Sequence, residues 1–229
     1  MKLFKLSPNE PGNKAEDLNA GLYRRVNRKI ANKIANILKN TFITPNHLTL
    51  LLFLLNFIIA YFFFRYTKTY NIVAGILLLI YYLIDQINGS LARIQNKASD
   101  LGTWYDHIND AFGLTLILIA IAIGVFHSTK DYRIFIFAFA SLSAYLFKDI
   151  MLNLYKTLRP NQNTTESLKK NKLIGMFIRN FSYDGVFIVP ILSILSFLNQ
   201  TNIALVFLAV YGWIFIIIQY VYLAEKLRE

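Results

Sequence analysis

The sequence contains no cysteine and only three histidines among its 229 residues. Without cysteine the chain has no disulfide, no thiolate metal ligand and no thiol nucleophile. The three histidines, His47, His107 and His127, are too few and too scattered to indicate a histidine-based metal site or a catalytic triad. Any chemistry of this chain is therefore expected to rest on carboxylates, amides and cationic side chains.

Acidic residues are also scarce, since 13 Asp and Glu stand against 24 Lys and Arg. By contrast, 55% of the residues are hydrophobic and the mean hydropathy is +0.42, which is typical of a polytopic membrane protein. The net charge of +11 raises nucleic acid as a partner, but the sequence has no nucleic-acid-binding motif. In a membrane protein such an excess is typical of basic segments beside anionic lipids. We therefore expect membrane lipids, and no nucleic acid, as partners.

Six apolar runs predict an all-α polytopic membrane protein with six transmembrane helices. The runs cover about 46–64, 70–93, 102–126, 134–155, 176–198 and 202–223. Before them, residues 17–40 combine hydrophobic and basic side chains at helical spacing. This pattern favours an amphipathic helix in the membrane interface, with a soluble helix packed on a core as the alternative. The expected division is an amino-terminal segment, 1–45, and a six-helix membrane domain, 46–225, that contains the candidate site.

Lys and Arg are distributed unevenly between the two ends of these runs. With a cytoplasmic amino terminus, nineteen lie in cytoplasmic segments, Lys148 lies inside a run, and four lie outside: Arg65, Lys68, Lys130 and Arg133. The positive-inside rule then predicts an integral protein of the cell membrane with a cytoplasmic amino terminus and an even number of spans. The polar turn between the second and third runs would face the cytoplasm.

That turn lies within the most informative stretch, DQINGSLARIQNKASDLGTWYDHIND, which runs from Asp85 to Asp110. Charged side chains so close to apolar runs are costly, which favours a functional role. Residues at helical spacing form two faces, one with Asp85, Asn88, Gly89, Ala92 and Arg93, the other with Gly102, Asp106 and Asp110. Two helices joined by a short turn are antiparallel neighbours, so we expect these faces to meet in one cavity.

Such a cavity would hold three carboxylates and an amide. Crowded carboxylates repel one another, and a hard divalent cation such as Mg²⁺ or Mn²⁺ is the usual way to hold them together. The small side chains of Gly89 and Ala92 leave room for a flat or phosphorylated ligand near the backbone. Arg93 can neutralise a phosphate. The stretch therefore predicts a metal-dependent phosphate site.

The stretch resembles the signature of the CDP-alcohol phosphotransferase (CDP-alcohol phosphatidyltransferase) family, D-x2-D-G-x2-A-R-x8-G-x3-D-x3-D. Every fixed position matches except the second aspartate, where this chain has Asn88. The resemblance implies a membrane enzyme of phospholipid biosynthesis. It would transfer a substituted phosphate from a CDP-linked donor, CDP-diacylglycerol or an ether-lipid analogue, to an alcohol acceptor and release CMP. It also implies two Mg²⁺ or Mn²⁺ ions and a homodimer.

The resemblance also implies roles for single residues. Metal-ligand positions are Asp85, Asn88, Asp106 and Asp110, of which Asp110 is also the expected catalytic general base. The nucleotide and diphosphate would be bound by Asp85, Gly89, Ala92 and Arg93, together with Asn46 of a TPN-x-x-T segment that is also similar to the family. Lys148 and Arg179 are candidate acceptor-binding residues. For Lys148 two readings stay open: a structural ion pair with Asp149, against which stands that adjacent residues on a helix do not face each other, and contact with an anionic substrate.

Several alternatives stay open. Asn88 fits an engineered knock-out that traps substrate, a natural neutral ligand, or an inactive relative that binds CDP-lipid and metal without turnover. His107 fits either a ligand or a polar neighbour that points away from the active face. An ion-coupled transporter would use the same buried carboxylates, but the sequence has no matching halves to support it. The acceptor alcohol is not specified by the sequence.

Overall fold

The computed structural model of the chain describes residues 22–159 and 182–228. In these ranges the regular structure is entirely helical. The helices are α2 (Leu22–Leu38), α3 (Pro45–Arg65), α4 (Lys68–Ile94), α5 (Asp100–Thr129), α6 (Arg133–Leu158), α9 (Gly185–Phe197) and α10 (Thr201–Arg228). The predicted all-α membrane fold is thereby confirmed.

In the part of the chain that the structure describes, five helices are long and apolar enough to cross a membrane, namely α3, α4, α5, α6 and α10. The fifth expected span differs, because α9 has 13 residues and begins at Gly185, whereas the apolar run was expected at 176–198. Residues 176–181 of that run lie outside the described residues. Within residues 22–159 and 182–228 the structure therefore has five helices of spanning length and one shorter apolar helix, and the expected count of six spans is not confirmed.

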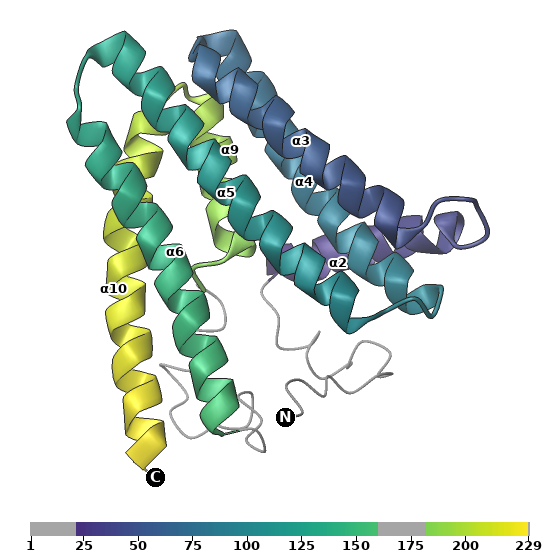
Figure 1. Cartoon of the computed structure of the whole chain (residues 1–229). Helices are drawn as coiled ribbons and strands as arrows, with labels where there is room; N and C mark the ends of the chain where they lie inside the picture. The colour runs from purple at the N-terminus through teal and green to yellow at the C-terminus, as the bar shows by residue number, and fades with distance from the viewer. Residues whose placement is uncertain (1–21, 160–181, 229) are drawn as a thin grey trace.

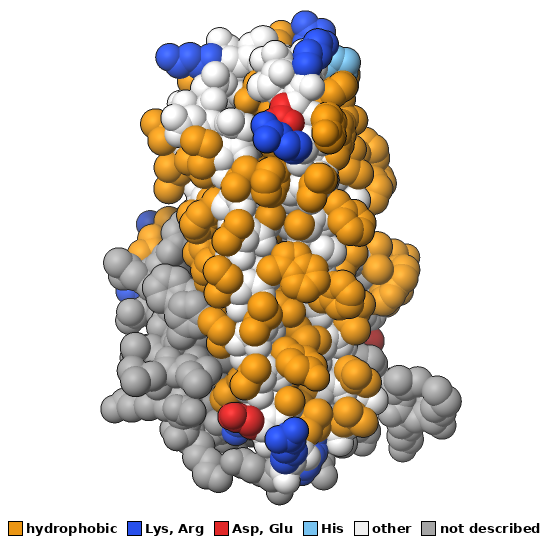
Figure 2. All heavy atoms as spheres, turned by 90° about the vertical axis from the view of Figure 1, so that its left-hand side faces the viewer, with side chains coloured by type: hydrophobic (Ala, Val, Ile, Leu, Met, Phe, Trp, Pro, Cys, Tyr) orange, Lys and Arg blue, Asp and Glu red, His pale blue; other side chains and the backbone are white. Residues whose placement is uncertain are grey.

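The surface of the bundle is hydrophobic between two charged ends. Figure 2 shows one face on which hydrophobic side chains cover the middle, while Lys, Arg, Asp and Glu side chains gather above and below. Large apolar side chains such as Ile136 and Phe139 of α6 are more than 60% exposed. Apolar surface of this extent is characteristic of contact with lipid and not with water.

The bundle is held together through α3, which packs closely on both α4 and α5, while α9 packs on α4 and α10 packs on α6 (Figure 1). The helices α4 and α5 are consecutive, but they do not pack closely on each other. Their contact runs through side chains, because Tyr81 of α4 donates to Asp110 of α5 at 3.2 Å. The polar faces of α4 and α5 therefore meet across a space and not through closely packed backbones.

Helix α2 crosses the end of α3 and α4 (Figure 1). Its Ala31 and Ala35 are fully buried against Leu48 of α3 and against Ile87 and Leu91 of α4. The predicted amphipathic helix, 17–40, is confirmed over 22–38, and residues 17–21 lie outside the described residues. Because Ile87 and Leu91 belong to the signature segment, α2 supports the part of α4 that carries the candidate site. The position of α2 in the membrane interface stays a prediction.

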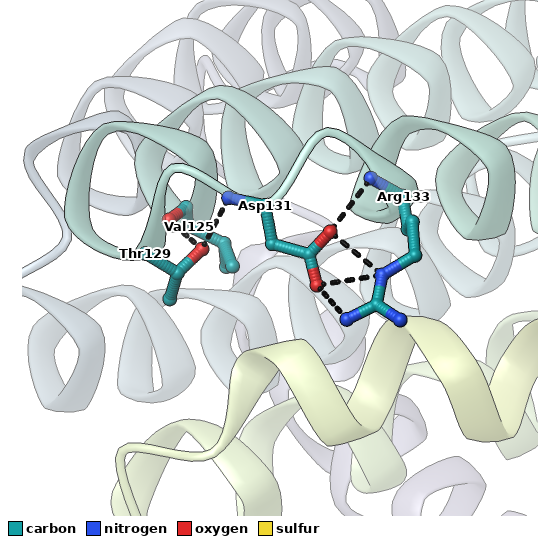
Figure 3. A network of polar contacts seen from close by, with 4 residues as sticks. All are labelled: Val125, Thr129, Asp131 and Arg133. Atoms are coloured by element: carbon teal, nitrogen blue, oxygen red, sulfur yellow. Dashed lines mark hydrogen bonds and ion pairs between the residues drawn. The ribbon is translucent and has the colours of Figure 1, made fainter.

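The turn between α5 and α6 is closed by Asp131 at the end of α5 opposite to Gly102. Arg133 donates to the Asp131 carboxylate from its backbone nitrogen at 3.0 Å and from Nη2 at 2.8 Å (Figure 3). The Asp131 nitrogen donates to Thr129 Oγ1, which in turn donates to Val125 O. The hydrogen bonds from Arg133 hold the pKa of Asp131 below its usual value. These contacts set the reversal of the chain at the end of the bundle away from the signature.

Candidate active site

The two halves of the signature lie on two unbroken helices, as their spacing predicted. Residues Asp85 to Arg93 belong to α4, and Gly102 to Asp110 belong to α5. Between them, Ser99 Oγ accepts a hydrogen bond from the Gly102 nitrogen at 3.0 Å and caps the start of α5. The short turn therefore places both halves of the signature at the same end of the bundle.

Asp85 of α4 and Asp110 of α5 line one cavity of about 220 Å³. Its other polar lining residues come from several elements and include Asn56, Tyr81, Gln86, Tyr145 and Asp184. Apolar side chains such as Leu78 and Ile188 complete the walls. The carboxylates of α4 and α5 therefore face the same space between the helices, as the spacing of the signature predicted.

Asp106 is not part of this lining, although the charges of both Asp106 and Asp110 act on Asp85. Within residues 22–159 and 182–228, no three acidic or histidine side chains lie close enough together to hold a metal ion by themselves. The expectation of three signature carboxylates in one cavity is thus met only in part. Asp184, which the sequence analysis did not select, provides the third carboxylate of the lining.

Asn88 provides an oxygen that fits a cation. The residue is 7% exposed, and its Oδ1 has no hydrogen-bond partner. Its Nδ2 donates to Thr49 Oγ1 at 3.1 Å, and Thr49 Oγ1 donates to Pro45 O at 3.2 Å. Because the Thr49 hydrogen is already used, Thr49 accepts from Asn88, which turns Oδ1 of the amide away from Thr49. A buried oxygen without a donor is costly, so a cation at Oδ1 would be favourable.

The remaining nucleotide-site candidates are more open. Gly89 and Ala92 are half-buried, and Arg93 is exposed in the last turn of α4. A Cβ at Gly89 would come no closer than 3.6 Å to Arg93 Nη1, so packing does not require glycine there. The missing side chain instead leaves room beside the backbone. Asn46 is exposed at the start of α3, one turn before Thr49.

Lys148 lies beside the cavity. It is 5% exposed, and its Nζ is 4.7 Å from the ring centroid of Tyr145, which lines the cavity. Its Nζ is also 3.0 Å from Asp149 Oδ1, so the two adjacent residues form the ion pair that was one of the two readings of this pair. The lysine stem is long and flexible enough to bend back to its neighbour. The charge of Lys148 acts on Asp110 as well.

His107 and Arg179 are the two remaining candidates from the sequence. His107 is exposed on α5. Arg179, the second acceptor-binding candidate, lies outside the described residues.

Comparison with known proteins agrees with the signature. The sequence model for CDP-alcohol phosphatidyltransferase matches residues 42–219. The chain belongs to this family. The match includes both halves of the signature and every described helix from α3 to α9, together with most of α10. Members of the CDP-alcohol phosphatidyltransferase family generally depend on divalent metal.

Parts of this chain are similar to parts of several curated relatives. Over 139 residues it is 32% identical to a bifunctional IPC transferase and DIPP synthase of Aquifex aeolicus, covering 59% of this chain and 29% of the relative. Over 92 residues it is 35% identical to an archaetidylinositol phosphate synthase of Pyrococcus horikoshii, covering 40% and 47%. Over 101 residues it is 37% identical to a bifunctional IPC transferase and DIPP synthase of Thermococcus kodakarensis, covering 43% and 22%. The chain therefore spans less than half the length of each of these relatives.

The structure adds functional candidates that the sequence analysis missed. Thr49 contacts Asn88, while Asn56, Asn109 and Tyr81 connect to Asp110. The two asparagines are amides within apolar helices, which is a signal that could have found them. Tyr81 gave no such signal, because it is one of 14 tyrosines in the chain.

Proposed function

We propose that this CDP-alcohol phosphatidyltransferase family member transfers a substituted phosphate from a CDP-linked lipid to an alcohol and releases CMP in phospholipid biosynthesis. The main support is the cavity that Asp85 and Asp110 line together, one from each half of the signature. Asn88 adds a buried oxygen without a partner one turn along α4 from Asp85. An oxygen-rich site of this kind suits a diphosphate bound with a hard cation.

Mg²⁺ or Mn²⁺, and by analogy with the family two ions, fits the oxygen ligands of Asp85, Asn88 and Asp106, with Asp110 as a further contact. When bound, such ions neutralise charge on the diphosphate and on the departing CMP. The described carboxylates do not form a complete cluster. Oxygens of the donor's diphosphate and of water would complete the ligand set.

The acceptor hydroxyl gives its proton to the Asp110 carboxylate. Its oxygen forms a bond to the lipid-bearing phosphorus, and the bond from that phosphorus to the bridging oxygen breaks, so that CMP leaves with the bridging oxygen. Arg93 neutralises phosphate charge, and Gly89 and Ala92 give the nucleotide room beside α4. Asn46, at the start of α3, also binds the nucleotide.

The acceptor in this proposal is a phosphorylated polyol such as an inositol phosphate, and the donor carries an archaeal ether lipid. The name of the Pyrococcus horikoshii relative specifies archaetidylinositol phosphate as its product. A buried Lys148 beside the cavity favours an anionic acceptor, and Arg179 is a second candidate for its phosphate. In this proposal the site opens to the cytoplasm, and two copies of the chain form a homodimer.

Release of CMP by the purified full chain tests this function. CDP-archaeol and CDP-diacylglycerol serve as donors, and inositol phosphate, inositol and glycerol phosphate serve as acceptors, each with Mg²⁺ or Mn²⁺. We expect turnover only with phosphorylated acceptors. Lys148→Met should raise the acceptor KM about tenfold or more, the scale of a lost charge-assisted bond, and leave the donor KM unchanged. Equal turnover with inositol, or no turnover with any pair, would contradict the proposal.

A further inference from the structure

A continuous chain of buried hydrogen bonds joins three helices and ends on Asp110. Asn56 Nδ2 of α3 donates to Asn109 Oδ1 of α5 at 3.1 Å. Asn109 Nδ2 donates to the Tyr81 hydroxyl of α4 at 3.3 Å, and that hydroxyl donates to Asp110 Oδ1 at 3.2 Å. Asn56 and Asn109 are 1% and 6% exposed. Polar groups buried in a membrane bundle are costly unless they are bonded, and here each link has a partner.

The direction of the chain follows from the charge at its end. An ionised Asp110 has no hydrogen to give, so the Tyr81 hydroxyl must donate to it. The Tyr81 oxygen can then only accept, which turns the NH₂ group of Asn109 towards it. The Asn109 oxygen is left facing Asn56, whose NH₂ group must point back. Every amide in the chain is therefore oriented to support a negative charge on Asp110.

The crossing of α3 and α5 leaves space for this arrangement only because residue 113 has no side chain. A Cβ at Gly113 would lie 2.6 Å from both Cγ and Nδ2 of Asn56. Asn56 is thus held against the backbone of α5, one turn beyond Asn109. Since α4 and α5 do not pack closely, the bond from Tyr81 to Asp110 is a link across the space between them.

We propose that Asn56, Asn109 and Tyr81 are positioning residues that hold Asp110 in place for proton transfer. The inference rests on the proposed function, in which Asp110 accepts the proton of the acceptor hydroxyl. Tyr81 occupies Oδ1 of the carboxylate and so directs Oδ2 to the reaction. Both Asn56 and Tyr81 line the cavity, so the chain forms one wall of the space in which the acceptor would lie. A carboxylate misplaced by about 1 Å can lose on the order of a hundredfold in rate.

Tyr81→Phe, Asn109→Leu and the double variant test whether the links act as one unit. Each single change should lower kcat about tenfold to a hundredfold and leave the KM of donor and acceptor unchanged. Once the Tyr81 hydroxyl is gone, Asn109 no longer acts on Asp110. The double variant should therefore lose no more than Tyr81→Phe alone, whereas losses that multiply would overturn the inference.

Tyr183→Phe is the matched control for a lost buried hydroxyl. Tyr183 is fully buried, and its hydroxyl lies 2.7 Å from Ser141 Oγ, between the segment before α9 and helix α6. This variant should lose thermal stability as Tyr81→Phe does but retain kcat. A similar loss of kcat in both variants would mean that the hydroxyl of Tyr81 is only structural, and it would overturn the inference.

Infrared spectra give a readout that does not need turnover. The difference between the unaltered chain and Asp110→Asn isolates the carboxylate stretch of Asp110. This band should shift in Tyr81→Phe and stay in place in Tyr183→Phe. An unmoved band would overturn the inference. A shifted band in a chain that turns over no donor would support the hydrogen-bonded chain and contradict the proposed function, so the two failures are distinguishable.

Discussion

Asn88 stands where the family signature has an aspartate, and its contact with Thr49 shows how an amide fits there. Thr49 donates to Pro45 O and accepts from Asn88 Nδ2, so the amide is satisfied on one side and presents Oδ1 on the other. An aspartate has nearly the same shape. The Thr49 hydroxyl could rotate to donate to it instead of to Pro45 O, so the site can accommodate either residue.

We predict that Asn88→Asp raises both metal affinity and CMP release. The substitution adds one negative charge one turn from Asp85, and the affinity of an oxygen site for a divalent ion rises with ligand charge. The expected gain in affinity is on the order of tenfold, equivalent to about 1.4 kcal/mol. Without metal, the extra carboxylate should increase repulsion and lower stability. Calorimetric titration with Mg²⁺ and Mn²⁺, together with CMP assays, measures both effects.

Asp106→Ala is the control for this experiment, because it removes a proposed ligand and should abolish binding. If the asparagine form is fully active and Asn88→Asp is no better, Asn88 is a natural neutral ligand and the charge argument is wrong. If both forms bind metal and CDP-lipid without turnover, the chain is a binding protein of the family. Unchanged metal binding in Asp106→Ala would place the metal elsewhere.

Residues within one helix could be predicted from the sequence, whereas contacts between helices could not. Spacing along α4 was enough to place Asp85 and Asn88 within one helical segment, because an α-helix fixes those relations locally. The bond from Tyr81 to Asp110 depends on how far apart α4 and α5 lie, which no spacing specifies. For the same reason the sequence did not single out Asp184 as a neighbour of the signature carboxylates.

At the scale of helices, α5 packs on α3 through glycines. Gly113 and Gly124 are eleven residues apart, about three turns, and so lie on the same side of α5. A Cβ at Gly124 would lie 2.5 Å from Phe63 O and 3.0 Å from Phe64 O, both in the backbone of α3. Small residues of this kind let membrane helices approach closely.

We predict that Gly124→Ala lowers the free energy of unfolding by about 1–3 kcal/mol, the usual cost of overpacking. The backbone of α3 cannot rotate out of the way as a side chain could, so the helices must separate. Thermal unfolding in detergent measures the loss. Gly185→Ala is the control, because its Cβ would come no closer than 4.0 Å to Tyr82. Equal stability of the two variants would show that the α3–α5 contact tolerates the extra carbon.

Helix positions were predictable to within a few residues wherever the apolar run was long. The run expected at 70–93 is α4, Lys68–Ile94, and that expected at 202–223 is α10, Thr201–Arg228. Hydropathy reports only that a segment avoids water, so it did not distinguish the short α9 from a full span. It also gave no information on which helices pack together, so the close packing of α3 on both α4 and α5 was not predicted.

At the scale of the whole molecule, the two ends of the bundle differ in charge and in content. The turns that carry Arg65 and Lys68, and Lys130 and Arg133, lie together at the end away from the signature (Figure 1). Asn71 Nδ2 donates to Asn199 Oδ1 at 2.7 Å and joins the turn between α9 and α10 to this same end. The other end holds the signature turn and α2. The basic residues of both segments are among the nineteen Lys and Arg that the sequence assigns to the cytoplasmic side.

We predict that the signature turn faces the cytoplasm and the turn between α5 and α6 faces outward. Helix α5 has 30 residues and is therefore about 45 Å long, enough to separate its two ends by a membrane. The chain has no cysteine, so Lys97→Cys and Lys130→Cys each introduce a single thiol, and the unaltered chain is the blank. A membrane-impermeant maleimide added to intact cells should label Lys130→Cys and reach Lys97→Cys only after permeabilisation. The reverse pattern would mean that the positive-inside rule fails for this chain and that the cavity opens away from the cytoplasm.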